Sequence, residues 1–253
     1  MKFIAEIGVN HLGSEESAVS YCEMLSSTSV DAVTLQIRED DFYDASNPWK
    51  RPLSKECYFE CAKIIKASGK SFGIAASDLM VAQRNADLCP DFWKVLSWGI
   101  KDIPLIQFLV NTNATTYVST GISDLIEIKS VADFFDQKVK FIHTQLSTEI
   151  ADVNLAAIAT IRNATGCDVS FGLHCDNFDI INVAIPYEPH AIFFYVKKKE
   201  NYEYPDGSYA IMVKDIDRII NQSLILQSGI GDGEKHKFTP KTLIEGDKPK
   251  SLK

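Results

Sequence analysis

The chain opens with the stretch Met1-Lys-Phe-Ile-Ala-Glu-Ile-Gly-Val-Asn-His-Leu-Gly-Ser14, in which an apolar run leads directly into a group of polar residues. The run has the length and composition of a buried strand, and Glu6, Asn10 and His11 lie at or near its carboxyl end. The Gly-Ser pair that follows offers a helix start. A strand with a carboxylate, an amide and an imidazole at its carboxyl end, followed by a helix, is what the first unit of a (β/α)8 barrel looks like when the active site lies at the strand ends.

Similar apolar runs recur along the chain and alternate with helix-like segments. Strands are predicted over residues 2–8, 31–37, 71–75, 92–97, 115–119, 138–143, 168–173 and 190–196. Helices are predicted over residues 15–28, 54–68, 79–88, 102–111, 122–136, 152–164, 177–186 and 212–228, several with polar starts. Strict alternation is typical of parallel strands joined by helical crossovers. The sequence therefore predicts an α/β fold, a (β/α)8 TIM barrel.

Length and composition indicate one barrel domain. The chain has 253 residues, 45% of them hydrophobic, which suffices for one large core. We assign residues 1–228 to the barrel and residues 229–253, which are rich in Gly, Lys and Pro and lack periodicity, to a polar C-terminal tail. The connections over residues 38–53 and 197–211 are longer than a barrel needs, and long loops on the active face usually carry function.

Charge and hydropathy argue against several classes of partner. The net charge of −8 disfavours a nucleic-acid surface, which needs an excess of Lys and Arg. No apolar run approaches the roughly 18 residues of a membrane span, and the N-terminus does not resemble a signal peptide. We therefore expect a cytoplasmic protein that acts on small molecules. The six cysteines are expected to be reduced, and the helically spaced pair Cys57 and Cys61 to be core residues rather than a metal clip.

Polar side chains at the ends of the first seven predicted strands form a group of candidate site residues. After the opening cluster they are Gln36 and Arg38, Ser77 and Asp78, Lys94 and Ser97, Ser119 and Thr120, His143 and Gln145, and His174 and Asp176. Because the carboxyl ends of parallel strands meet at one end of a barrel, we expect these side chains to face one pocket. Gln36 and Lys94 stand within apolar runs, where an unpaired polar group is costly, so each needs a partner or a ligand.

The segment over residues 118–123, Val-Ser-Thr-Gly-Ile-Ser, places hydroxyls and a glycine between a strand and a helix. Backbone N–H groups and the helix dipole favour an anion at such a junction. Together with Lys94 and Ser97, the segment would form a phosphate cradle. The alternative is a helix N-cap at Ser119 or Ser123 beside a solvated lysine, and the sequence leaves both interpretations open.

Several of these stretches resemble motifs of one known family, the N-acetylneuraminate (sialic acid) synthases. Residues 5–13 match its opening motif Ala-Glu-Ile-Gly-x-Asn-His-x-Gly. Residues 31–36 resemble Asp-Ala-Val-Lys-x-Gln, residues 94–97 resemble Lys-Ile-x-Ser, and residues 119–121 match Ser-Thr-Gly, in the same order. The likeness extends over about residues 3–240.

The resemblance implies an aldolase-type barrel enzyme of carbohydrate biosynthesis. Such an enzyme is a phosphoenolpyruvate-dependent, C–C bond-forming transferase that condenses phosphoenolpyruvate with an N-acyl hexosamine such as N-acetylmannosamine and releases phosphate. The motif matches imply catalytic roles for Glu6, His11 and Gln36, phosphoenolpyruvate binding by Lys94, Ser97, Ser119 and Thr120, and sugar binding by Asp206 and His143.

The resemblance also implies a divalent metal, Mn or Mg, which the family holds with two histidines. His174 falls at the first of these positions, but Tyr195 stands at the second. A neutral phenol is a poor ligand for these ions, which prefer carboxylate, carbonyl and water oxygens. Asp176 and Glu6 remain alternatives for the second ligand.

Two other charges of the family pattern are missing, because Thr34 replaces the second-strand lysine and Gly99 the acid expected after Ser97. The family's C-terminal antifreeze-like domain, which contributes to the partner subunit's sugar site, is not expected here, although a homodimer is possible. The first hypothesis is thus a divergent synthase of a sialic-acid-like nonulosonic acid. The alternative is a catalytically impaired homologue that binds a phosphorylated sugar or a partner synthase. A further alternative is another aldolase-type reaction on a phosphorylated small molecule, because fold alone decides no chemistry.

Overall fold

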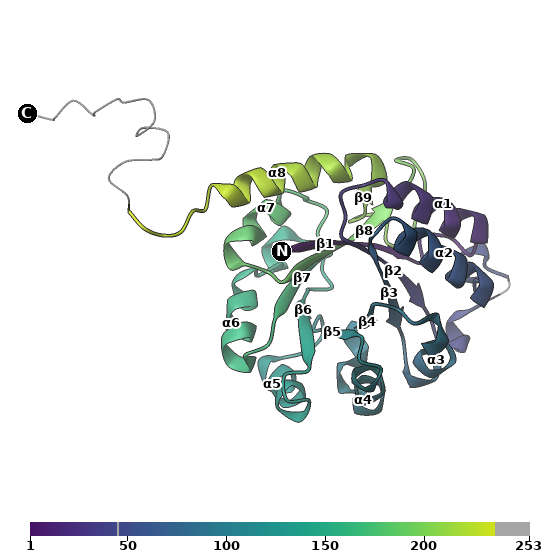
Figure 1. The fold of residues 1–253 in the computed structure, drawn as a ribbon, viewed down its shortest axis with the longest axis horizontal. Coiled ribbons are helices and arrows are strands. Elements are labelled where there is room, and N and C mark those ends of the chain that lie inside the picture. Colours follow the sequence, from purple (N-terminus) through teal and green to yellow (C-terminus); the bar gives the residue numbers. More distant parts are fainter. Residues whose placement is uncertain (45, 236–253) are drawn as a thin grey trace, which may run out of the picture.

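Eight parallel strands form a closed barrel surrounded by helices in the computed structural model, which describes residues 1–44 and 46–235 (Figure 1). The barrel strands are β1 (Lys2–Gly8), β2 (Ala32–Ile37), β3 (Ser71–Ala76), β4 (Phe92–Val95), β5 (Thr115–Ser119), β6 (Val139–His143), β7 (Val169–Leu173) and β8 (Ala191–Lys197). The helices are α1 (Glu15–Ser26), α2 (Lys55–Ala67), α3 (Leu79–Arg84), α4 (Ile103–Asn111), α5 (Leu125–Phe134), α6 (Ala156–Thr165), α7 (Ile180–Ala184) and α8 (Ile216–Ser228).

Each strand pairs with its sequence neighbours, and β1 also pairs with β8, which closes the barrel. This order confirms the predicted (β/α)8 TIM barrel. A ninth strand, β9 (Ile211–Met212), was not predicted from the sequence. It pairs in parallel with the end of β8, so that the long connection after β8 returns to the mouth of the barrel.

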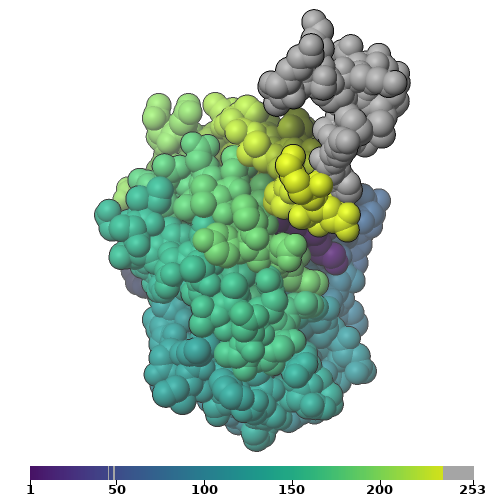
Figure 2. All heavy atoms as spheres, turned by 90° about the vertical axis from the view of Figure 1, so that its left-hand side faces the viewer, coloured from purple at the N-terminus to yellow at the C-terminus, as the bar shows by residue number. Residues whose placement is uncertain are grey.

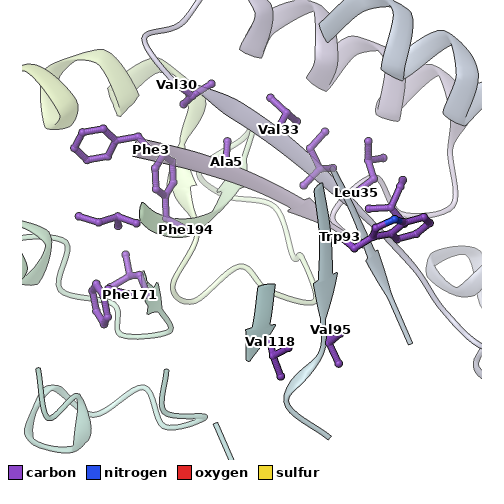
Figure 3. Close-up of a cluster of buried hydrophobic side chains, with 14 of the residues drawn as sticks. Phe3, Ala5, Val30, Val33, Leu35, Trp93, Val95, Val118, Phe171 and Phe194 are labelled. Carbon is purple, nitrogen blue, oxygen red and sulfur yellow. The ribbon is translucent and has the colours of Figure 1, made fainter. Parts of the chain in front are cut away.

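Alternation along the strands separates two groups of buried side chains. Side chains such as Phe3, Val33 and Trp93 point away from the barrel axis toward the helices (Figure 3). The intervening residues point inward, where Phe92, among others, fills the amino-terminal end of the barrel. A Cβ at Gly73 would lie 2.1 Å from Cζ of Phe92, so this glycine makes room for the ring. The same two-residue period continues each inward row to a polar position at the carboxyl end.

Local capping explains where several helices begin. Ser54 and Asp78 cap α2 and α3, as their predicted polar starts indicated. The start predicted at Asp152 is wrong: Asp152 ends a 3-10 helix, Ile150–Asp152, and α6 begins at Ala156. The helix predicted over residues 122–136 begins at Leu125 because Asp124 caps it.

The later helices cover the side of the molecule seen in Figure 2, coloured from teal to yellow.

No helix within residues 1–44 and 46–235 combines the length and apolarity needed to cross a bilayer. Residues 229–235 form no helix or strand, and the rest of the predicted tail, residues 236–253, lies outside the described residues. The domain boundary at residue 228 therefore stays a prediction. All six cysteines are free, and Cys57 and Cys61 are buried, as expected of core residues.

Candidate active site

A cavity of about 400 Å³ opens at the carboxyl ends of the barrel strands. Eight of the residues predicted to form the site line it: Glu6, Gln36, Lys94, Ser97, Ser119, His174, Tyr195 and Asp206. Glu6, Gln36, Lys94, Ser119 and Tyr195 face inward near the carboxyl ends of their strands, and Ser97 and His174 follow just beyond a strand end. The shared parity of the strand positions brings them together from distant parts of the sequence. The expectation that polar strand ends face one pocket is thus met for Glu6, Gln36, Arg38, Lys94, Ser97, Ser119 and His174. The other strand-end residues of that expectation do not line the pocket: Asn10, His11, Ser77, Asp78, Thr120, His143, Gln145 and Asp176.

An ion pair lies at the base of the pocket. The ammonium group of Lys94 on β4 donates a hydrogen bond to Oε2 of Glu6 on β1, and the two side chains are only 5% and 4% exposed. The ammonium nitrogen also lies 5.6 Å from the centroid of the Tyr195 ring. Glu6 is therefore the partner that the sequence required for Lys94. A carboxylate removed from water in this way depends on the neighbouring cation.

Hydroxyl groups line the pocket beside Lys94. Oγ of Ser119 and Oγ1 of Thr144 are buried and have no hydrogen-bond partner among the described residues. Gly121 allows the chain to pass close to Ser97 and Thr144, because a Cβ at this position would lie 2.7 Å from Oγ of Ser97 and 3.1 Å from Cγ2 of Thr144. Buried hydroxyls are usually hydrogen-bonded, so those of Ser119 and Thr144 are placed to bind a ligand.

The helix-cap alternative for this segment does not hold. The cap of α5 is Asp124, whose carboxylate accepts the N–H of Glu127 while the Glu127 side chain accepts the N–H of Asp124. Oγ of Ser123 has no hydrogen-bond partner in the described part of the chain, like that of Ser119. Neither serine caps the helix, which favours the cradle interpretation of Ser119.

Three aromatic rings and a carboxylate also line the pocket. The His174 ring stacks on Tyr209, with centroids 4.8 Å apart and an angle of 18°, and meets Tyr195 edge-on at 5.5 Å. The hydroxyl of Tyr209 donates to Oδ1 of Asp206 at 2.8 Å. Burial, with a smaller contribution from Lys94, lowers the pKa of His174 to about 4, so the ring is neutral at pH 7. Burial raises the pKa of Asp206 to about 6.

Asn10 attaches the loop that carries Asp206 to the barrel. Its Nδ2 donates to the carbonyl oxygen of Val196 at 3.0 Å, and its Oδ1 accepts the N–H of Asp206 at 3.1 Å. Lys197 adds a bond from Nζ to the carbonyl oxygen of Gly207 at 2.7 Å. The end of β1 and the end of β8 thereby fix the position of Asp206.

His11, Thr120 and His143 do not line this pocket. Nδ1 of His11 accepts the N–H of Gly13 at 3.1 Å, and burial lowers the pKa of His11 to about 4. Thr120 bonds the carbonyl oxygen of Ile142, and the His143 ring bonds a loop carbonyl, each through its side chain. These contacts hold loops in place and suit structural roles better than the predicted catalytic, phosphoenolpyruvate-binding and sugar-binding ones.

The rim contains Arg38, one of the polar strand-end residues expected to face the pocket, beside aromatic residues that the sequence did not assign to the site. Cζ of Arg38 lies 4.1 Å from the ring centroid of Phe42 and 5.0 Å from that of Trp98. Its guanidinium group makes two bonds to Glu39 and holds the pKa of that carboxyl at about 2. Trp49 also lines the pocket. The unusual length of the connection over residues 38–53 was the available signal, but it does not say which of its side chains turn inward.

The residues present do not fit a divalent metal. Within residues 1–44 and 46–235, no three His, Cys, Asp or Glu side chains are placed to hold one ion. Glu6 is already paired with Lys94, and Asp176 lies in a separate groove beside α7 and α8. Burial, together with Glu6 and Asp206, raises the pKa of Tyr195 well above its usual value, so the phenol stays neutral. Neither alternative for the second ligand therefore completes a site with His174.

Comparisons with known proteins identify the family of the chain. Pseudaminic acid synthase of Campylobacter jejuni is 21% identical over 257 residues, which cover 91% of this chain and 75% of that protein. The N,N'-diacetyllegionaminic acid synthase of the same organism is 22% identical over 260 residues, with 92% and 78% covered. A solved N-acetylneuraminic acid synthetase from Leptospira borgpetersenii, in complex with citrate, superposes with a TM-score of 0.86 at 18% identity, covering 99% of this chain and 91% of that one. Since the family profile of NeuB matches residues 22–235, the chain belongs to the NeuB family and is a sialic acid synthase-like barrel, as its motifs predicted.

Proposed function

We propose that this protein condenses phosphoenolpyruvate with an N-acyl hexosamine in the synthesis of a sialic-acid-like sugar acid. The observation that carries the proposal is that the buried Lys94 ammonium and the unpartnered hydroxyls of Ser119 and Thr144 line the same pocket. A cation with neutral donors around it suits the phosphate and carboxylate of phosphoenolpyruvate. The synthases named above act in the same class of reaction, which supports the choice of substrates.

The residues divide into three roles in this proposal. Lys94, Ser97 and Ser119 bind phosphoenolpyruvate, and Glu6 sets the orientation of Lys94 through their hydrogen bond. Asp206 accepts a hydrogen bond from a sugar hydroxyl, since its Oδ2 has no partner among the described residues. The aromatic rim shields the reacting atoms from water, which strengthens these electrostatic contacts.

A non-catalytic relative is the second candidate, and the aromatic side chain at the second metal position favours it. Such a protein would keep the anion cradle and bind a phosphorylated sugar, or associate with an active synthase. The cytoplasmic location and the homodimer stay predictions under either candidate.

The two candidates are separated by measuring phosphate release. The protein is incubated with phosphoenolpyruvate and, in turn, N-acetylmannosamine and hexosamines that carry a second N-acyl group, with and without Mn²⁺. Release that requires both substrates and is lost in Ser119→Ala but kept in Lys101→Ala, an exposed lysine outside the pocket, supports the synthase. Binding of phosphoenolpyruvate without release from any acceptor supports the second candidate, and the absence of binding contradicts both.

A further inference from the structure

Tyr195 occupies the place at which the resemblance puts the second metal-binding histidine. It is 6% exposed, and its ring meets His174 and Tyr209 edge-on, at 5.5 and 5.4 Å between centroids. Burial and the nearby carboxylates of Glu6 and Asp206 raise the pKa of its hydroxyl. The group is therefore a neutral hydrogen-bond donor at the wall of the pocket and not an anionic ligand.

The surroundings of His174 also oppose a divalent cation. The imidazole is held by stacking on Tyr209 and meets the Tyr195 ring edge-on, and the Lys94 ammonium lies 5.6 Å from the centroid of that same ring. A cation bound at this imidazole would be repelled by the same ammonium group. The nearby Asp206 carboxylate already accepts a hydrogen bond from Tyr209, and the described residues offer no third ligand that would complete a site with it and His174.

Tyr195 and Asp206 are packed together around Gly8. A Cβ at Gly8 would lie 2.6 Å from Cε1 of Tyr195 and 2.9 Å from Oδ2 of Asp206, and the backbone there has a φ of +56°. Glycine is favoured at such a φ, and the missing side chain leaves room for the ring beside the carboxylate. The phenol and the carboxylate thus line the pocket together, and the Lys94 ammonium lies 5.6 Å from the centroid of the Tyr195 ring.

We propose that this pocket works without a divalent metal and that the Tyr195 hydroxyl donates a hydrogen bond to the carbonyl oxygen of the acceptor, in the place of the metal. The role toward the acceptor rests on the proposed function, whereas the absence of metal binding does not. A positioned donor stabilises the negative charge that develops on a carbonyl oxygen during attack.

The step balances with water as co-reactant. The electron pair of the C2–C3 double bond of phosphoenolpyruvate forms the new bond to the carbonyl carbon, and the carbonyl pair moves to the oxygen that Tyr195 faces. Water adds to C2, and one of its protons neutralises that oxygen. The resulting C2 centre expels phosphate, which carries away the other proton, and leaves a ketone. Tyr195 ends the reaction with its own proton.

Binding of Mn²⁺, followed by electron paramagnetic resonance, tests the proposal directly. The wild-type protein is titrated with and without phosphoenolpyruvate, and with Mn²⁺ and phosphoenolpyruvate alone as a blank. No saturable site is expected. Tyr195→His restores a second imidazole beside His174 and is expected to bind one Mn²⁺ at least ~10-fold more tightly than the wild type. One saturable site in the wild type that is lost in His174→Ala overturns the proposal.

Tyr195→Phe is the matched variant for the hydrogen bond. It keeps the ring and its packing, so phosphoenolpyruvate affinity is expected to stay within about threefold while phosphate release falls by ~10²-fold or more. Unchanged release overturns the role of the hydroxyl. If Tyr195→His does not fold, the wild-type titration still decides whether metal binds. A wild type that fails to bind phosphoenolpyruvate contradicts the proposed function and the carbonyl role, but leaves the metal result standing.

Discussion

Lys94 and Glu6 neutralise each other in a place where neither side chain reaches bulk water. Withdrawing both charges from water costs several kcal/mol, and their attraction offsets this cost only while both are present. Apolar residues of similar size would stabilise the barrel at least as well. The pair is therefore better explained by the ligand of the pocket than by the stability of the fold.

Removing one partner should reveal that dependence. Lys94→Met leaves Glu6 buried without a counter-charge, and we expect the free energy of unfolding to fall by about 3–5 kcal/mol. The double variant Lys94→Met/Glu6→Gln should recover most of that loss, because no charge is then left unpaired. Urea denaturation of the three proteins measures both effects. A single variant as stable as the double one would show that Glu6 does not depend on Lys94.

The sequence identified residues best where a polar side chain interrupts an apolar run, as at Gln36 and Lys94. It assigned His143 to the site, although His143 lies at an outward-facing position of β6. It missed Thr144, which lies two residues after the inward-facing Ile142 and therefore shares its direction. The two-residue period contained that information. Trp49 and Tyr209 were missed for a different reason: Trp49 lies in a short 3-10 helix, Pro48–Lys50, and Tyr209 in an irregular loop, so no strand period indicates the direction of either side chain.

At the scale of elements, the strand ends were predictable because hydrophobic runs stop where chains leave the barrel. The helix starts were harder to predict from the sequence, because each depends on a single capping residue such as Asp124. β9 is too short for a periodic signal and forms through its pairing with β8. That pairing and the two bonds of Asn10 fix the loop between β8 and β9 against the pocket.

Loss of the Asn10 bonds should loosen that loop specifically. In Asn10→Ala the buried carbonyl of Val196 loses its side-chain donor, and the N–H of Asp206 loses its acceptor. We expect a decrease of about 1–3 kcal/mol in the free energy of unfolding and faster amide hydrogen exchange over residues 198–209. Asn221→Ala on the exposed face of α8 is the matched control. Exchange that is equally slow in both variants would contradict the anchoring role.

For the whole molecule, the buried titratable groups set how stability changes with pH. The pKa of His11 and of His174 is lowered to about 4, so between pH 4 and 6.5 the unfolded chain binds protons that the folded chain does not. Stability therefore rises with pH across this window. The pKa of Asp206 is raised to about 6, so this group makes an opposite contribution between about pH 4 and 6. The two histidines together contribute more to the change of stability with pH than Asp206 does, so the free energy of unfolding rises overall.

We accordingly expect the melting temperature to increase from pH 4.5 to 6.5. His11→Asn keeps an acceptor for the N–H of Gly13 but does not titrate. The rise in the free energy of unfolding with pH should therefore be smaller in this variant than in the wild type, by about 3 kcal/mol at most. Asp206→Asn should make the profile steeper, because the opposing contribution is gone. Scanning calorimetry of the three proteins measures this, and a wild-type profile that falls with pH would refute the assignment.

The barrel as a whole followed from the strict alternation of eight strands and eight helices, which leaves few other topologies. The family motifs located the two metal positions, His174 and Tyr195, but the described residues offer no group of three ligands there, and the two rings pack edge-on. A motif match places a residue in the fold, but the chemistry of the site depends on what surrounds it.

The central claim is that Lys94 and the hydroxyls beside it bind phosphoenolpyruvate. We would titrate phosphoenolpyruvate by calorimetry into metal-free wild type, the Lys94→Met/Glu6→Gln variant and the Lys101→Ala control. Saturable binding at one site in wild type and control, weakened at least ~10-fold in the double variant, is the predicted result, since a charge-assisted contact contributes about that much. Equal affinity in all three proteins, or no binding by the wild type, would contradict the claim.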